Sequence, residues 1–508
     1  MMCSCYSDKS TMRTIAYPEI VINPSEKADT LTVSYGDRLS IRATAIQSGV
    51  PDSDLEYLWE MDMAANKTNG RAFLSDTPDV DFTVAQPASD IPYTLSLTVT
   101  NRQTGYLKVR HWSIYVTSTL GEGLLVGHTR DGGKTSELDL ICSPAVTYGY
   151  TSAAPHVTRD ALGIIGEEKL EGRISAMEYS VLTDMSASTV KSYNEPLLSI
   201  ATDRHFYVVD PTTYTLKRRD GACFMGYTAD RYDVDFVKNA GAVSCQVLCN
   251  SKLMTVSSLM DNTFAVVSSP MQGGVGFTPK NFCSVTQKQG DVYAFDEVKK
   301  VFYTQRCWCL HQSALSTMVG SIAPTPDFLA DKTSVACGEF NGMSGIYILK
   351  GKSDDYHAVV LCAVNSRDAE IYDLTLPEVD KAVSFAFCDN AGIFYYATPD
   401  KIYSSLLTSG KFNTRALTWK PDSPAEKITG ICQYLQGWYG NHDYDAATYD
   451  FVLNTNRLQM IITTYNASTG EGKVYLRPFN VATGMFTYKD NGVFDGFGEI
   501  TSVTSTMR

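Results

Sequence analysis

The stretch Gly121–Cys142, GEGLLVGHTRDGGKTSELDLIC, divides the chain into two parts. It predicts a strand at Leu124–Val126, a tight Asp-Gly-Gly-Lys turn at residues 131–134 and a return strand at Ser136–Ile141. Glycine supplies the positive φ that hairpin turns need, so Asp-Gly-Gly between two alternating runs is a strong hairpin signal. Before this hairpin lies about one small sandwich domain of chain, and after it a long series of similar β units. We interpret it as the joint between two domains and as the first blade of the second.

Length and composition set the broad class. A chain of 508 residues is too long for one ordinary core, and its 44% hydrophobic content argues against wholesale disorder. Tyrosine is abundant, at 30 residues, and turn residues are frequent, which favours an all-β protein. The net charge of −13, with scattered basic residues, argues against nucleic-acid binding, which needs a basic face. No apolar run reaches the roughly 18 residues of a transmembrane helix.

The cysteine pattern favours free thiols. There are thirteen cysteines, and none lies between Cys5 and Cys142. Most of the later ones sit within apolar, strand-like runs. Buried free cysteine behaves as a small hydrophobe, so we interpret these residues as core and not as a disulfide framework. They are Cys245, Cys337, Cys362, Cys388 and Cys432.

Residues 19–120 read as an immunoglobulin-like sandwich. Short strands alternate with turns over about 100 residues, which is the spacing of such a fold. The clearest are Tyr57-Leu58-Trp59 and the alternating Tyr93–Val99. Trp59 stands where a central strand would carry a core tryptophan. Without a cysteine pair, hydrophobic packing must hold the two sheets together.

Residues 121–508 read as a β-propeller. Strand clusters recur in units of roughly fifty residues, which suggests six to eight four-stranded blades, most simply seven. An open ring would leave exposed sheet edges, so we expect residues 499–503 to pair into the blade of Leu124–Ile141. Residues 152–195 are expected to be a long helical or irregular insertion after the first hairpin, because they include the polar runs Arg159–Gly163 and Glu167–Glu171.

Motifs for catalysis, metal binding and cofactors are not found. Gly-x-Ser-x-Gly, His-Glu-x-x-His, the P-loop and Gly-x-Gly-x-x-Gly are all missing, so we predict no catalytic residue and no cofactor. Cys307, Cys309 and His311 would share one face of a strand, but zinc needs about four ligands, and we interpret them as core. Asp443 and Asp445 lack the spacing of a calcium loop. We therefore predict no metal site.

A polar, aromatic loop is the strongest candidate binding site. Residues 436–445, QGWYGNHDYD, lie between apolar strands and should be exposed. Exposed rings stack on sugars or on peptide side chains, and nearby polar groups supply hydrogen bonds. Contact with a partner protein and local packing are the alternatives. The candidate residues are Trp438, Tyr439, Asn441, His442 and Tyr444. A second, glycine-rich candidate is Pro270–Phe277.

Residues 1–18 resemble the tail of a lipoprotein signal followed by a tether. Met1-Met2-Cys3-Ser4-Cys5 places small residues before a cysteine, and polar residues follow it. The run Tyr57–Trp59 with Tyr93–Asn101 resembles the PKD (polycystic-kidney-disease-like) domain. Placed after Cys5 and before Gly123–Val126, it resembles the PKD-like lipoproteins of Bacteroidota-type bacteria.

This resemblance implies a cellular location and a biological role. It implies lipid attachment at Cys5, the outer membrane facing the cell exterior, and a nutrient-uptake system with a SusC-like TonB-dependent transporter and a SusD-like lipoprotein as partners. The protein would be non-catalytic, binding an oligosaccharide or peptide or bracing the complex. Two alternatives are a propeller-fold glycan hydrolase or lyase with unidentified carboxylates, and a purely structural adhesion module.

Overall fold

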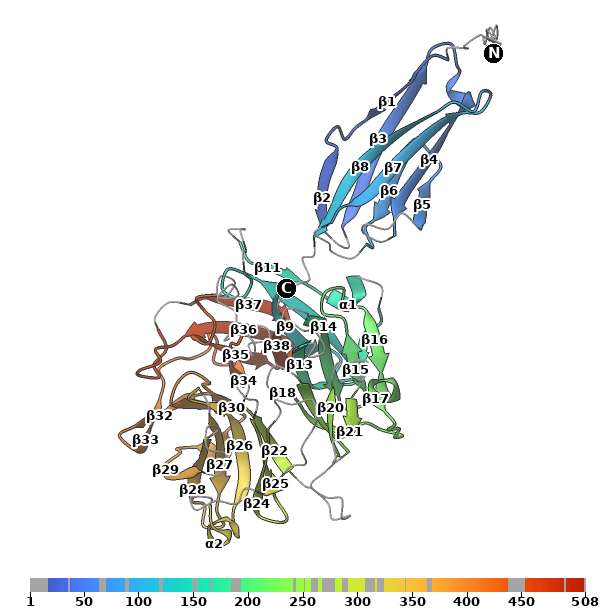
Figure 1. Cartoon of the computed structure of the whole chain (residues 1–508). Helices are drawn as coiled ribbons and strands as arrows, with labels where there is room; N and C mark the ends of the chain where they lie inside the picture. The colour runs from blue at the N-terminus through green and yellow to red at the C-terminus, as the bar shows by residue number, and fades with distance from the viewer. Residues whose placement is uncertain are drawn as a thin grey trace, which may run out of the picture. The chain divides into compact units, whose positions relative to one another are not determined.

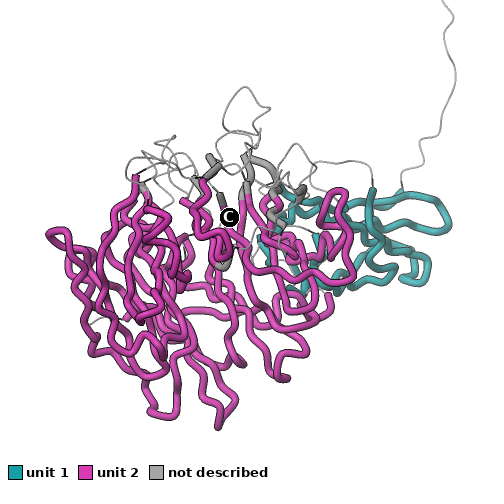
Figure 2. The backbone as a smooth tube through the Cα atoms, turned by 90° about the horizontal axis from the view of Figure 1, so that it is seen from below, with its two compact units in different colours: residues 1–119 teal, residues 120–508 magenta. Residues whose placement is uncertain are grey.

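The chain folds almost entirely as β-strands (Figure 1). It forms two compact units, residues 1–119 and 120–508, which are coloured separately in Figure 2. The computed structural model describes residues 17–34, 37–63, 70–86, 91–117, 122–148, 150, 154–164, 167–183, 193–240, 244–250, 252–256, 264–266, 279–285, 291–306, 316–317, 324–342, 344–362, 368–436, 453–487 and 490–506.

The first unit is a two-sheet β-sandwich. One sheet has the order β1-β3-β6, and the other has the order β2-β8-β7-β4-β5, with β2 and β8 parallel. The strands of the first sheet are β1 (Ile20–Pro24), β3 (Arg38–Gln47) and β6 (Asp79–Thr83). Those of the second are β2 (Thr30–Ser34), β8 (Leu107–Thr117), β7 (Tyr93–Asn101), β4 (Leu55–Asp62) and β5 (Arg71–Ser75).

Two tryptophans centre the sandwich core. Trp59 on β4 is fully buried, and its ring stacks on Trp112 of β8 with centroids 5.3 Å apart. Alternate residues of β3, from Ile41 to Gln47, also face this core, as a strand with one solvated face requires. The core position predicted for Trp59 is confirmed. Strands β5 and β6 were not predicted, because each has five residues and few apolar positions to mark a period.

The second unit is a ring of β-sheets. In the described residues it has seven sheets of four or five strands. From the centre outward, sheet 1 has β38 (Glu499–Thr506), β9 (Gly123–Thr129), β10 (Thr135–Cys142) and β11 (His156–Thr158), with β12 (Leu170–Glu171) beside β10. Sheet 2 has β13 (Ile174–Thr183), β14 (Tyr193–Thr202), β15 (Phe206–Val209) and β16 (Leu216–Arg219). Sheet 3 has β18 (Val234–Ala240), β19 (Ser244–Cys249), β20 (Lys252–Val256), β21 (Phe264–Val266) and β17 (Phe224–Met225), and sheet 4 has β22 (Pro279–Ser284), β23 (Asp291–Asp296), β24 (Val301–Arg306) and β25 (Ser316–Thr317). Sheet 5 has β26 (Thr333–Phe340), β27 (Ser344–Lys350), β28 (Tyr356–Cys362) and β29 (Ala369–Leu374). Sheet 6 has β30 (Ser384–Phe387), β31 (Ile393–Ala397), β32 (Ile402–Thr408) and β33 (Lys411–Ala416). Sheet 7 has β34 (Lys427–Gln433), β35 (Gln459–Asn466), β36 (Glu471–Pro478) and β37 (Gly492–Phe497).

This arrangement is that of a β-propeller. Successive innermost strands contact one another, from β38 to β13 and on through β18, β22, β26, β30 and β34, and they meet near the centre of Figure 1. The last strand, β38, pairs antiparallel with β9, from Glu499 opposite Thr129 to Thr506 opposite Gly123. The predicted pairing of the C-terminal strand into the first blade is confirmed. Sheet 1 is therefore built from both ends of the unit.

The hairpin that opens the ring is formed as predicted. Strands β9 and β10 pair in register, and Gly132 and Gly133 have φ of 75° and 90°. The Asp131 carboxylate accepts hydrogen bonds from the backbone N–H and the hydroxyl of Thr135 and from the N–H of Lys134. These bonds hold the pKa of Asp131 well below its usual range. The turn is thus closed by its own aspartate.

The prediction of a long insertion at residues 152–195 is wrong. Among the described residues of this segment, helix is limited to the four residues of α1 (Ala161–Ile164), and Ile174–Thr183 is β13, the innermost strand of sheet 2. Polar residues at 159–171 hid the start of this blade, because they form salt bridges with Asp139 and Glu137 of sheet 1 and do not alternate with apolar ones. The chain passes from sheet 1 to sheet 2 within this segment.

The described cysteines are free thiols within the ring. Cys245 and Cys388 are fully buried, whereas Cys337 and Cys432 are partly buried. The core interpretation is confirmed for the first two. The side chain of Cys362 lies outside the described residues.

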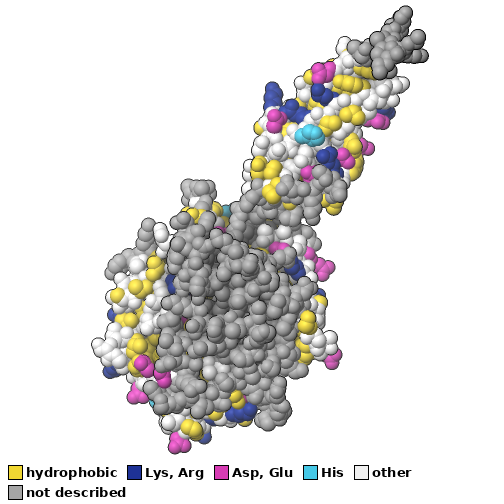
Figure 3. Space-filling view, viewed as in Figure 1, with side chains coloured by type: hydrophobic (Ala, Val, Ile, Leu, Met, Phe, Trp, Pro, Cys, Tyr) yellow, Lys and Arg dark blue, Asp and Glu magenta, His cyan; other side chains and the backbone are white. Residues whose placement is uncertain are grey.

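The described helices are short, and the charged side chains in view are of both signs. No helix in the described ranges, including α1 and α2 (Pro326–Leu329), has the length and apolar character needed to cross a bilayer. Figure 3 shows acidic and basic side chains intermixed over the described part of the face in view.

Replacing Trp59 with alanine should lower the free energy of unfolding of the sandwich by about 3–5 kcal/mol, because a large buried side chain would leave a cavity. Urea denaturation of the full chain measures this. Leu58→Ala is the control, since Leu58 is the neighbouring residue and is 36% exposed. An equal loss in both variants would contradict the core position of Trp59.

Gly498→Ala should destabilise the ring by about 1–3 kcal/mol, because an added Cβ would lie 2.1 Å from the carbonyl oxygen of Thr129. The clash lies where β37 leads into the closing strand. Gly392→Ala is the matched control, since its Cβ would meet its nearest neighbour at an ordinary 3.5 Å. Thermal unfolding curves that coincide for the two variants would contradict the prediction.

Candidate functional site

The residues predicted as sites from sequence lie outside the described residues. They are Cys5, Trp438, Tyr439, Asn441, His442 and Tyr444, together with Cys307, Cys309, His311, Asp443, Asp445 and Pro270–Phe277. Their roles remain predictions.

The base of the aromatic loop is described. The N–H of Leu453 donates to Gln436 Oε1 at 2.7 Å, so the two ends of the intervening segment meet. Gln436 is buried, and its Nε2 donates to Glu122 Oε1 at 2.9 Å. This bond connects sheet 7 to the residue that precedes β9. The segment that carries Trp438 therefore starts and ends beside the closure of the ring.

A histidine and two carboxylates meet at the closure. His128 Nε2 on β9 lies 3.1 Å from Asp139 Oδ2 and 4.0 Å from Glu137 Oε2, both on β10. Within the described part of the chain, this is the single group of three or more His, Cys, Asp or Glu side chains close enough to share a metal ion. His128 and Asp139 are buried. A metal ion would therefore have to compete with the cations around these two side chains.

Cations already neutralise these carboxylates. Arg159 Nη1 lies 2.7 Å from Asp139 Oδ2, and Lys169 Nζ lies 2.5 Å from Glu137 Oε1. The backbone N–H of Gly498 donates to His128 Nδ1 at 3.2 Å, which leaves the ring proton on Nε2. A metal ion would have to displace these protons and cations. We interpret the group as a structural latch.

The latch connects the first and last sheets. Arg159 Nη2 donates to the carbonyl of Asp495 at 2.6 Å, and its guanidinium lies 4.6 Å from the centre of the Phe497 ring. His128 meets the same ring edge-on, with centroids 5.8 Å apart. Burial raises the pKa of Asp139, but hydrogen bonds from His128, Asp160 and Arg159 outweigh it and hold the pKa below its usual value.

The innermost strands bring one cation near acidic and thiol groups. The charge of Lys238 on β18 acts on Glu178 of β13 and on the thiols of Cys337 (β26) and Cys432 (β34). Burial raises the pKa of each thiol to about 12, so both thiols are protonated at neutral pH. Burial also raises the pKa of Glu178, which Lys238 and the N–H of Asn239 oppose.

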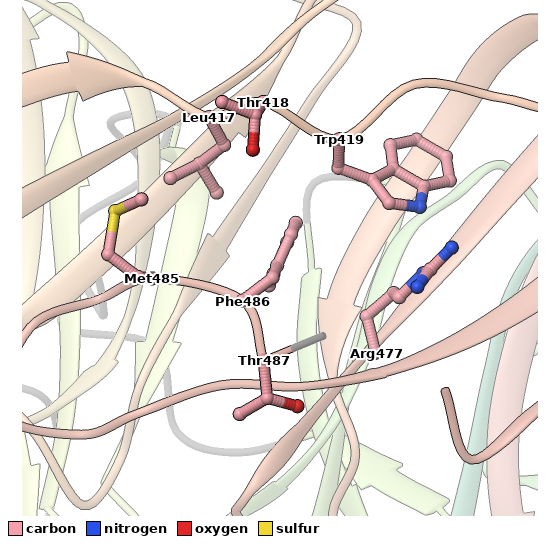
Figure 4. A pocket seen from close by; sticks show the side chains of 7 residues that line it. All are labelled: Leu417, Thr418, Trp419, Arg477, Met485, Phe486 and Thr487. Carbon is pink, nitrogen blue, oxygen red and sulfur yellow. The ribbon is translucent and has the colours of Figure 1, made fainter. Parts of the chain in front are cut away.

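A pocket of about 180 Å³ opens between sheets 6 and 7 (Figure 4). The segment after β33 supplies one side, and the end of β36 with the loop before β37 supplies the other. An ordered water occupies roughly 30 Å³, so the pocket has room for about six waters or one small ring. The lining residues are Leu417, Thr418, Trp419, Arg477, Met485, Phe486 and Thr487.

The pocket walls are held by packing between the two sheets. Phe486 stacks on Tyr395 of β31 with centroids 5.9 Å apart, and its backbone bridges to Phe479. Trp419 is 8% exposed and packs edge-on against Tyr475 of β36, with centroids 5.3 Å apart. Fixed aromatic walls of this kind pre-organise a site.

Two buried donors beside the pocket have no acceptor among the described residues. Trp419 Nε1 and Arg477 Nε are buried and make no hydrogen bond. The guanidinium of Arg477 lies 5.6 Å from the centre of the Trp419 ring, and Figure 4 shows the nitrogen edge of the indole turned toward it. Both nitrogens have almost no surface open to solvent, so they lie behind the pocket wall and not on its surface.

Sequence reasoning did not find this pocket. Its walls come from segments about sixty residues apart, residues 417–419 and 477–487. The isolated tryptophan in Leu417-Thr418-Trp419, just after a strand, was the available signal. That signal is indistinguishable from a core tryptophan without the partner sheet.

The comparisons with known proteins do not identify a family. No family model and no curated protein matches the chain. Solved structures similar to it include a quinonprotein alcohol dehydrogenase-like protein from Bacteroides thetaiotaomicron, with 12% identity, 96% of this chain and 98% of that chain covered, and a TM-score of 0.49. Apo AztD from Citrobacter koseri has 8% identity, coverage of 89% and 98%, and a TM-score of 0.37. Hsv2 from Kluyveromyces lactis has 7% identity, coverage of 78% and 94%, and a TM-score of 0.35. Our assignment of the fold rests on the strand pairing described above.

Asp139→Asn should lower the stability of the ring at pH 7 by about 1–3 kcal/mol, because it weakens the charge-assisted bonds from Arg159 and from the backbone N–H of Asp160. The folded-state pKa of Asp139 is depressed, so its contribution is present above the unfolded pKa near 3.9 and is lost as pH falls through the folded pKa. The difference in the free energy of unfolding between the variant and the native protein should therefore become smaller below about pH 4.

Urea denaturation between pH 3 and pH 7 measures this difference in the free energy of unfolding. Asp495→Asn is the control, because the exposed Asp495 enters the latch through its backbone carbonyl. A difference in the free energy of unfolding that does not change with pH would show that Asp139 contributes packing and not charge.

Proposed function

We propose that this protein is a non-catalytic, lipid-anchored accessory of a SusCD-like outer-membrane uptake complex, where it binds a ligand beside the transporter. The observation that carries the binding role is the pocket between sheets 6 and 7. Its described lining has apolar walls and no carboxylate, histidine or thiol to perform chemistry. Such a site suits holding a molecule and not converting it.

The cellular role rests on the sequence resemblance. The first unit is a sandwich with a Trp59–Trp112 core, an architecture compatible with the PKD-like domain that Tyr57–Trp59 and Tyr93–Asn101 suggest. The lipid anchor at Cys5 and the SusC-like and SusD-like partners come from the same resemblance. A tether of residues 6–18 would span at most about 40 Å at roughly 3.3 Å per residue.

Affinity purification of the tagged full chain from native outer membranes tests this role. We expect a SusC-like transporter and a SusD-like lipoprotein to co-purify. Cys5→Ser should move the protein out of the membrane fraction, because the thiol that carries the lipid is removed. Cys3→Ser is the matched control and should stay membrane-bound. A native protein that purifies alone would contradict the accessory role.

One observation favours a glycan hydrolase or lyase as a second candidate function. Burial raises the pKa of Glu178 on the innermost strand β13, and a carboxyl group with a raised pKa suits general acid catalysis. Glu178→Gln in a turnover assay with neutral and acidic polysaccharides separates the two functions. Turnover by native protein that is lost in Glu178→Gln would establish the enzyme and overturn the non-catalytic assignment.

A further inference from the structure

We propose that the sandwich contacts the membrane surface with the end that carries Tyr17, where exposed apolar side chains enter the headgroup region of a zwitterionic bilayer. The inference rests on the proposed lipid anchor at Cys5 and deepens it by naming the surface that meets the membrane. It concerns the first unit alone and is independent of the pocket between sheets 6 and 7.

Side-chain hydrogen bonds define this end of the sandwich, called here the N-terminal end (Figure 1). Gln47 Nε2 donates to the carbonyl of Pro18 at 2.8 Å, and Gln47 Oε1 accepts from Asn101 Nδ2 at 2.7 Å. The start of β1, the end of β3 and the turn between β7 and β8 therefore meet there. The 11 residues of β8 begin at this end and reach Thr117 roughly 33 Å away.

Four large hydrophobic side chains with exposed fractions of 43% to 60% gather at the N-terminal end. Val21 and Ile46 lie opposite each other on neighbouring strands, so they share the outer face of the three-stranded sheet. Tyr17 stacks on Tyr106 with ring centroids 6.3 Å apart, and Leu107 follows Tyr106 directly. Exposed apolar residues normally occur singly, so a local group of them marks a contact surface.

The position of Cys5 in the chain identifies the membrane as the partner of this surface. Cys5 lies twelve residues before Tyr17, and such a stretch spans at most about 40 Å at roughly 3.3 Å per residue. A lipid on Cys5 would therefore keep the N-terminal end within that distance of the bilayer. Attachment through a short stretch of chain gives an effective concentration in the millimolar range, so a weak apolar contact would be occupied.

The charges at this end favour a zwitterionic surface. Lys108 is paired with Glu19 at 2.6 Å, and Arg102 with Glu56 at 2.8 Å. Neither cation is free to attract anionic lipid, which polybasic membrane-binding segments do with unpaired lysines and arginines. The contact is therefore apolar, and tyrosine suits it because its ring is apolar and its hydroxyl stays in the polar layer.

Hydrogen–deuterium exchange of the full chain tests the contact. An N-terminal histidine tag and a nickel-chelating lipid in phosphatidylcholine vesicles supply the attachment, so the result does not depend on lipidation of Cys5 in cells. We expect amide exchange in residues 17–23, 44–47 and 102–109 to slow when vesicles are added. Residues 71–75 should exchange as in solution, because they pair with the part of β4 farther from the N-terminal end.

A matched pair of variants tests the apolar side chains. Partition of the untagged chain into phosphatidylcholine vesicles, measured by sedimentation, should fall about 3- to 10-fold in the Ile46→Ser, Leu107→Ser double variant, because less apolar surface leaves water. Phe73→Ser is the control and should leave the partition unchanged, since Phe73 is 62% exposed but lies opposite Glu60, away from this end. Thermal unfolding of both variants should match the native protein.

The outcomes are separable. Exchange at the N-terminal end that vesicles leave unchanged, equal losses of partition in the double variant and Phe73→Ser, or tighter binding to phosphatidylglycerol vesicles would each overturn the inference. The proposed function fails separately. A chain that is not lipidated in cells, or that purifies without a transporter, would contradict the accessory role while its tagged form still contacted vesicles through this end.

Discussion

The pairing of β38 with β9 is the constraint on which the ring depends. Each sheet buries its faces against its two neighbours, so a ring left open would expose the faces and strand edges of the first and last sheets. The C-terminal strand closes this gap as the innermost strand of sheet 1. The latch, in which Arg159 contacts the buried His128–Asp139 pair, then connects the same sheet to β37. Closure thus combines a backbone ladder with charge-assisted hydrogen bonds.

Tyrosine does much of the packing between neighbouring sheets. Several of the largest fully buried side chains in the ring are tyrosines, and the hydroxyls of Tyr347, Tyr395, Tyr396 and Tyr434 donate to backbone carbonyls. Tyr347 donates to the carbonyl of Tyr293 at 2.8 Å, and Tyr396 donates to that of Pro377 at 2.8 Å. A ring fills the wedge between sheets while its hydroxyl satisfies an otherwise unpaired group. This accounts for a tyrosine-rich composition in a propeller with few tryptophans.

The same packing creates the pocket. Sheets 6 and 7 meet through Trp419, Tyr475 and Phe486, and the space between them is incompletely filled where the segment after β33 approaches the end of β36. The two donors there are buried by the aromatic wall and not by a polar partner. A pocket between blades is therefore a consequence of how the ring is packed. The closure region, by contrast, satisfies its charges internally and acts as structure.

The sequence by itself determined the elements whose signal is local. The Asp131–Lys134 turn, the hairpin around it, the core position of Trp59 and the use of the C-terminal strand to close the ring all follow from patterns within a few residues or from the cost of open edges. The tertiary structure decided what depends on distant segments. Polar residues at 159–171 suggested an insertion, whereas their charges pair across sheet 1 and the chain then enters β13. Trp419 and Arg477 become a donor pair only when sheets 6 and 7 pack together, because no period in the sequence records which side chains from different sheets will meet.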